Sequence, residues 1–109
     1  MALLKGTLDV LVLKALSWGP MHGFEIITWL EARSGGRLAV ADAALIQSVH
    51  RMEERGLVAA QWGTTEKDRR ARYYRLTAAG RAHLDAQGRA LSDHVDAIAT
   101  VLAAKRAGR

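Results

Sequence analysis

The sequence predicts a mainly α-helical fold with a small β-hairpin, in the order helix, helix, helix, hairpin, long helix. Two observations support this prediction. Apolar residues recur at helical spacing before Gly56 and again after Thr77, whereas two short strand-like segments flank the polar stretch GTTEKDRR. The 109 residues include no cysteine and a single proline, so we expect one globular unit without disulfides.

The first helix is expected over roughly residues 3 to 17, because a Gly-Pro pair follows it. Leu8 and Val12 lie on one of its faces. At about 100° per residue, Leu3, Val10 and Leu13 fall on the opposite face. One face should therefore contact the core and the other a partner chain.

The second helix is expected within residues 22–33. The third is expected to start with Asp42 as its N-cap and to stop at Gly56 in the position after the helix end. Its buried stripe consists of Leu45, Val49 and Met52. Leu57–Trp62 and Ala71–Leu76 then read as the two strands of the hairpin.

Thr77 is expected to cap a last helix that runs from Ala78 to about Arg106. Thirty helical residues span about 45 Å. A helix of that length cannot bury its apolar stripe on so small a body, so we expect it to pack on a second chain. That stripe consists of Leu84, Leu91, Val95, Ile98 and Leu102.

Three helices followed by a two-stranded hairpin form the layout of a winged helix-turn-helix, in which the third helix enters a DNA major groove. Gln47 and Arg51 lie one turn apart, opposite the buried stripe. Gln pairs with adenine and Arg with guanine, each worth about 1–3 kcal/mol of discrimination. A solvated helix face is the alternative interpretation. The predicted DNA contacts of this helix are Ala43, Ala44, Ile46, Gln47, Ser48, His50 and Arg51.

The hairpin is the most basic part of the chain. Lys67–Arg75 holds five basic residues and one acidic residue, whereas the whole chain has a net charge of +5. Two tyrosines are interleaved and can offer hydroxyls to phosphate. This density of arginine favours nucleic acid over a solvated loop. The predicted wing contacts are Thr64, Thr65, Lys67, Arg69, Arg70, Arg72, Tyr73 and Tyr74.

Other functions lack residues to support them. The four histidines are scattered, and no Ser-His-Asp order or glycine-rich phosphate loop occurs, so we expect no metal, no cofactor and no enzymatic activity. Lys5, Asp9 and Lys14 interrupt the apolar N-terminal segment, which argues against a signal peptide or a membrane span. We therefore expect a cytoplasmic protein.

The three tryptophans, Trp18, Trp29 and Trp62, are expected to pack in the core, with an aromatic ligand cavity as the alternative. If two long helices pair about a symmetry axis, a cavity between them and beside the first helix is a candidate site for a small hydrophobic or aromatic effector.

Three segments resemble the PadR family of bacterial transcriptional regulators: GTLD at residues 6–9, GPMHG at 19–23 and RRARYYRLTAAG at 69–80. The resemblance covers residues 3 to about 84. It implies a winged helix-turn-helix DNA-binding domain over residues 1–76 and a dimerisation helix over residues 77–109, which packs partly against the first helix of the partner. It also implies repression that a small molecule relieves.

One departure falls on the third helix. The family typically has Leu-Tyr-Pro-Ala-Leu where this chain has Leu45-Ile46-Gln47-Ser48-Val49, so Ile46 and Gln47 occupy the Tyr and Pro positions. Two hypotheses follow. The first is an effector-responsive homodimeric repressor that binds a pseudo-palindromic double-stranded DNA operator. The second is a winged-helix dimer that has lost specific DNA reading and serves as a ligand-binding or protein-interaction module.

Overall fold

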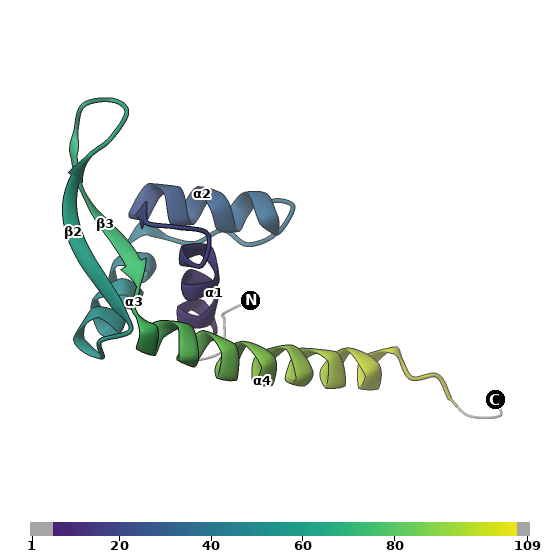
Figure 1. Ribbon diagram of the computed structural model, residues 1–109. Coiled ribbons are helices and arrows are strands. Elements are labelled where there is room, and N and C mark those ends of the chain that lie inside the picture. Colours follow the sequence, from purple (N-terminus) through teal and green to yellow (C-terminus); the bar gives the residue numbers. More distant parts are fainter. Residues whose placement is uncertain (1–5, 107–109) are drawn as a thin grey trace.

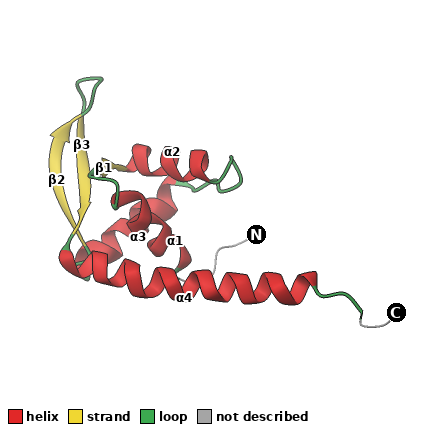
Figure 2. Ribbon diagram, turned by 45° about the vertical axis from the view of Figure 1, so that its right-hand side comes forward, coloured by secondary structure: helices red, strands yellow, loops and turns green. Residues whose placement is uncertain are grey.

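The computed structural model describes residues 6–106. Its helices are α1 (Thr7–Leu16), α2 (Gly23–Arg33), α3 (Asp42–Glu54) and α4 (Ala78–Ala103), and its strands are β1 (Met21–His22), β2 (Val58–Thr64) and β3 (Arg70–Leu76). The strands form an antiparallel sheet in the order β1-β3-β2. In Figures 1 and 2 the β2–β3 hairpin stands beside the three short helices, while α4 runs along their base and extends past them. The predicted mainly α fold with a small hairpin is confirmed.

Helix α1 is the centre of the core because it packs against α2, α3 and α4 at once. Val12 and Leu13 are both fully buried, and Val10 is only 9% exposed. The prediction that Leu13 and Val10 face a partner chain is therefore wrong, because neighbours within the same chain cover both sides of the helix. Leu3 lies outside the described residues. The helix itself begins at Thr7, four residues later than predicted.

The helix ends follow local hydrogen-bonding rules. His22 caps α2: its Nδ1 accepts from the Glu25 backbone N–H at 3.3 Å, and the Glu25 carboxylate accepts from the His22 backbone N–H at 3.1 Å. At α3 the N-cap is Ala41, so the expected Asp42 is instead the first helical residue, where its charge still suits the helix dipole. Gly56 has φ 74° and ends α3 as predicted. The two-residue strand β1 was not predicted, because it is too short to show an alternating pattern.

The start of α4 is fixed against the junction of α3 and β2. Thr77 caps the helix as predicted: its hydroxyl oxygen accepts from the Gly80 N–H at 3.0 Å and donates to the Gly56 carbonyl at 2.7 Å. Gly80 lies so close to the Leu57 carbonyl that an added Cβ would stand 1.9 Å from its oxygen. Only glycine allows this approach, so Gly80 sets where α4 crosses the base of the hairpin.

The apolar stripe of α4 divides into two parts. Leu84 is 9% exposed and belongs to the core of its own chain, and Leu91 packs partly against that core. The distal part of the helix extends past the body (Figure 1), and Val95, Ile98 and Leu102 are 53%, 43% and 80% exposed. The predicted partner-facing role is therefore wrong for Leu84, whereas no other described residue covers the distal stripe. The helix ends at Ala103 rather than at Arg106.

Two of the three tryptophans are on the surface. Trp18 and Trp62 are 65% and 58% exposed, so the prediction of core packing is wrong for both, whereas Trp29 packs partly against the core. The Arg33 guanidinium lies over the rings of Trp18 and Trp29, at 5.4 and 5.3 Å from their centroids. Arginine thus covers apolar rings that a core of this size does not enclose.

Candidate nucleic-acid interface

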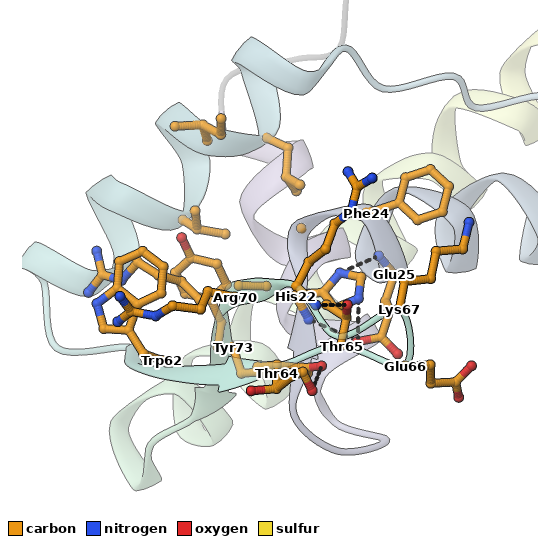
Figure 3. A pocket seen from close by; sticks show the side chains of 18 of the residues that line it. His22, Phe24, Glu25, Trp62, Thr64, Thr65, Glu66, Lys67, Arg70 and Tyr73 are labelled. Atoms are coloured by element: carbon orange, nitrogen blue, oxygen red, sulfur yellow. Dashed lines mark hydrogen bonds and ion pairs between the residues drawn. The ribbon is translucent and has the colours of Figure 1, made fainter.

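An open cleft of about 1050 Å³ separates α3 from the hairpin. Its walls include Ile46 and His50 from α3, Trp62 and Arg70 from the hairpin, and Phe24 from the start of α2. In Figure 3, Trp62 and Arg70 lie together on one side of this cleft and Phe24 on the other. The structure therefore brings residues from both predicted sets, the third helix and the wing, to one concave surface.

The outward side of α3 presents small and polar residues. Ala43, Gln47 and His50 are exposed, and Ala44 at the edge of this face is half-buried. Ile46 is 50% exposed, which matches its predicted position outside the buried stripe. Small side chains at the start of a helix allow its backbone to approach a groove, and Gln47 projects from the next turn.

Ser48 and Arg51 have a different role from the one predicted. Ser48 is fully buried and donates its hydroxyl proton to Asp9 Oδ1 at 2.5 Å. Arg51 Nη2 donates to the same oxygen at 2.8 Å, although the Arg51 side chain remains 54% exposed. Ser48 cannot contact DNA, because it lies between α3 and α1. Arg51 is anchored at one nitrogen and presents only the rest of its guanidinium to the surface.

Asp9 accepts hydrogen bonds from both Ser48 and Arg51, a role that the sequence analysis did not predict. It is 7% exposed on α1, and a buried carboxylate requires hydrogen-bond donors. The sequence contained a signal for it, since an acidic residue inside an apolar helix is seldom buried without a partner. Its carboxylate therefore links α1 to α3 through hydrogen bonds from Ser48 and Arg51.

The tip of the hairpin is an ordered turn. The Thr65 backbone N–H donates to the Arg69 carbonyl at 2.8 Å, and the Thr65 hydroxyl accepts from the Arg69 N–H at 3.2 Å. Asp68 adopts φ 60° between them. Thr65 is thus half-buried and holds the turn, whereas Thr64, Lys67, Arg69 and Arg70 are exposed. The turn presents cations at the end of a stiff hairpin.

The aromatic residues of β3 support the hairpin from within. Tyr74 is 6% exposed, and burial raises the pKa of its phenol, partly offset by the nearby Arg72 charge. It packs in the core and exposes too little surface to contact DNA, so its predicted contact is wrong. The Tyr73 ring fills the space where Gly63 lacks a Cβ, and its hydroxyl donates to the Thr64 carbonyl at 3.4 Å.

Arg72 joins the hairpin to α3. Its Nη2 donates to Glu53 Oε2 at 2.9 Å, and both side chains are about one-third exposed. This pair partly neutralises a cation that the sequence assigned to DNA. The basic residues that remain exposed on the hairpin are Lys67, Arg69, Arg70 and Arg75. In the register of the sheet Arg75 alternates to the side opposite Arg70 and Arg72.

Other kinds of site find little support in the described part of the chain. Within residues 6–106, no group of three or more His, Cys, Asp or Glu side chains could hold a metal ion. No helix in that range has both the length and the apolar composition needed to cross a membrane.

Three helices, a basic hairpin and an exposed face on the third helix define a winged helix-turn-helix of the DNA-binding type. The model of the PadR-like family of transcriptional regulators matches residues 12–86. The chain therefore belongs to this family, as the resemblance of its motifs indicated. Family membership makes it a transcriptional regulator rather than an enzyme.

Solved structures of the same architecture agree. A PadR family transcriptional regulator from Eggerthella lenta is 26% identical, with a TM-score of 0.73 over 93% of this chain and 86% of that one. A transcriptional regulator from Clostridium thermocellum is 22% identical, with a TM-score of 0.77 over 88% and 93% of the two chains. Bacillus subtilis PadR, solved in complex with operator DNA, is 16% identical, with a TM-score of 0.67 over 75% of this chain and 46% of that one. The last two likenesses establish the fold.

Proposed function

We propose that the chain is an effector-responsive homodimeric repressor that binds a pseudo-palindromic operator in double-stranded DNA. The observation that carries this proposal is the shared cleft, which sets the exposed Ile46 and His50 of α3 beside the exposed cations of the hairpin. The complex of Bacillus subtilis PadR with operator DNA supports the assignment of DNA as the partner. A protein with this function works in the cytoplasm, together with its operator DNA.

In this proposal α3 enters the major groove. Gln47 is its best base-reading residue, because it is exposed and can pair with adenine through two hydrogen bonds. Ile46 can contact a thymine methyl group, and Ala43 permits close approach. Arg51 has fewer N–H donors available for a base than the sequence suggested, because Asp9 already binds one of its nitrogens. His50 completes the outward face.

The hairpin acts as a wing on the phosphate backbone. Lys67, Arg69 and Arg70 are exposed near its tip, which gives about six phosphate contacts per dimer. Each neutralised phosphate contributes about −0.9 to the slope of log K against log salt, so the slope should be about −5. Arg72 adds little to this number, because Glu53 partly neutralises it.

Dimerisation is assigned to the distal half of α4. Val95, Ile98, Val101 and Leu102 expose an apolar stripe that residues 6–106 leave uncovered. The exposure of this stripe supports a division into a DNA-binding domain over residues 1–76 and a dimerisation helix over residues 77–109. In such a dimer the two α3 helices must reach successive major grooves about 34 Å apart. The seam between the paired helices is the proposed site for a small hydrophobic or aromatic effector.

A second candidate function has its own support. Ile46 and Gln47 replace the Tyr-Pro pair typical of the family, and Ser48 and Arg51 are engaged with Asp9. A dimer that no longer reads DNA specifically, and that serves as a ligand-binding or protein-interaction module, fits these observations.

A gel shift with the DNA upstream of the chain's own coding sequence separates the two proposals. The repressor should shift this fragment at submicromolar dimer and moderate salt, and should prefer it to random DNA of equal length. Absence of a shift at micromolar dimer would favour the interaction module. Release of the fragment by an aromatic compound that binds the dimer would support the effector role.

A further inference from the structure

Trp62 is an exposed aromatic residue in the cleft with no role in the function proposed so far. It lies on β2 directly opposite Arg72 of β3, and Arg70 stands two residues along the same face. Figure 3 shows Arg70 beside Trp62. The Arg70 guanidinium lies 4.7 Å from the centroid of the indole and the Arg72 guanidinium 5.9 Å. One ring therefore contacts two cations of the wing.

The two arginines are held differently. Arg72 has a carboxylate partner, Glu53, on α3. For Arg70, no carboxylate of residues 6–106 lies within ion-pairing distance. The stack on Trp62 is therefore the main contact that orients the Arg70 guanidinium within the described part of the chain.

A guanidinium over an indole ring differs from an ion-paired one in the hydrogen-bond donors that it leaves available. An indole ring is uncharged and offers no hydrogen-bond acceptor atom, so Arg70 keeps its positive charge and its five N–H donors for another partner. A carboxylate would occupy some of those donors and offset the charge, as Glu53 does at one nitrogen of Arg72 and Asp9 does at one nitrogen of Arg51. Trp62 can therefore fix Arg70 without reducing its capacity to bind phosphate.

We propose that Trp62 is a positioning residue for DNA binding: it holds Arg70 in the cleft, ready for a bidentate contact with a backbone phosphate. This inference rests on the proposed DNA-binding function. An arginine that is not held in advance loses side-chain freedom on binding, and this loss weakens affinity. Arg72 completes the arrangement by linking the same ring to α3 through Glu53.

The test uses the full chain and a labelled random-sequence duplex, because phosphate contacts do not depend on sequence. Affinity is measured by fluorescence anisotropy across a salt series. The variants are Trp62→Leu, which removes the ring face, Trp62→Phe, which keeps one, Arg70→Ala and the double variant Trp62→Leu/Arg70→Ala. The matched control is Trp18→Leu, since Trp18 is also an exposed indole beneath an arginine but lies outside the cleft.

Trp62→Leu should weaken binding by about 5- to 30-fold per dimer, because each subunit loses a cation–π contact that orders one arginine. Trp62→Phe should retain most of the affinity, and Trp18→Leu should bind like the parent chain. The double variant should bind no more weakly than Arg70→Ala alone, because Trp62 acts through Arg70. Far-UV circular dichroism verifies that every variant is folded.

Equal affinities of the parent chain and a folded Trp62→Leu variant would overturn the positioning role, as would losses for Trp62→Leu and Arg70→Ala that add in full. Both of these outcomes leave the DNA-binding proposal standing. A parent chain that fails to bind any duplex even at low salt would refute the proposed function itself, and the positioning role with it.

Discussion

Replacement of Gly80 by alanine tests how α4 is fixed to the base of the wing. The added Cβ would stand 1.9 Å from the Leu57 carbonyl oxygen, so the two must separate by about 1.5 Å to reach ordinary contact at 3.4 Å. Because the obstacle is backbone, no flexible side chain can move aside. The same carbonyl accepts the Thr77 backbone N–H at 3.2 Å, so its displacement also strains the cap of α4.

The magnitude follows from three contributions. Overpacking costs about 1–3 kcal/mol, and a weakened hydrogen bond at the cap costs about 1 kcal/mol more. Alanine regains about 1 kcal/mol over glycine within a helix. We therefore expect Gly80→Ala to lower the free energy of unfolding by about 1–3 kcal/mol.

Gly88 provides the matched control on the same helix. The nearest atom to a Cβ at Gly88 is Leu84 Cδ1 at 3.7 Å, an ordinary contact, so Gly88→Ala should stabilise by up to about 1 kcal/mol. Urea unfolding followed by circular dichroism measures both variants at equal chain concentration, because a dimer's stability depends on concentration. A Gly80→Ala variant as stable as the parent, or equal changes for the two variants, would refute the close approach of α4 and Leu57.

Three further predictions concern the network, the dimer and base reading. Asp9→Ala should lower the free energy of unfolding by about 2–4 kcal/mol in urea titrations, because the buried Ser48 hydroxyl loses its acceptor. The double variant Asp9→Ala/Ser48→Ala should lose less stability than the sum of the two single losses. Fully additive losses would contradict the network. Ile98→Asp should produce monomers in analytical ultracentrifugation, whereas the control Thr100→Asp, on the opposite side of α4, should stay dimeric. A dimeric Ile98→Asp variant would exclude the distal stripe as the interface. Gln47→Ala should lose about 1–3 kcal/mol on cognate DNA and little on random DNA, as measured by competition binding; equal losses on both would reject base reading.

The order of the four helices and the hairpin could be predicted because each of them carries its own local signal. The stripe of Leu45, Val49 and Met52 in α3 shows helical periodicity, and Gly56 and Thr77 mark helix ends through backbone and side-chain chemistry. The charge of the wing was equally visible, because the basic residues of a hairpin are close in sequence. These features depend on neighbours within a few residues.

The roles that sequence reasoning missed depend on contacts between distant segments. Leu13 was placed on a partner face because periodicity gives an angle around the helix but not what surrounds it, and here α2, α3 and α4 cover it. The pairing of Asp9 with Ser48 and Arg51 joins residues about forty positions apart. The burial of Ser48 could have been predicted, since on a helical wheel it lies beside the buried stripe of α3, but its bond to Asp9 could not.

The surface position of Trp62 had no sequence signal of its own, because tryptophan is usually largely buried. Trp62 lies on the same face of β2 as the buried Val58, but four residues further along the strand. At that point the hairpin extends past the edge of the core, so the ring is exposed. In that position the ring meets Arg70 and Arg72 rather than apolar side chains. Only the pairing of β2 with β3 brings these three residues together.

Selection of binding sites from a random DNA library tests most directly the claim that α3 and the wing recognise an operator. We expect enrichment of pseudo-palindromic sequences with half-sites one helical turn, about 34 Å, apart. Gln47→Ala should relax one position in each half-site while the spacing is retained. A library that shows no enriched sequence after repeated rounds, with the dimer intact, would contradict the claim of specific DNA recognition.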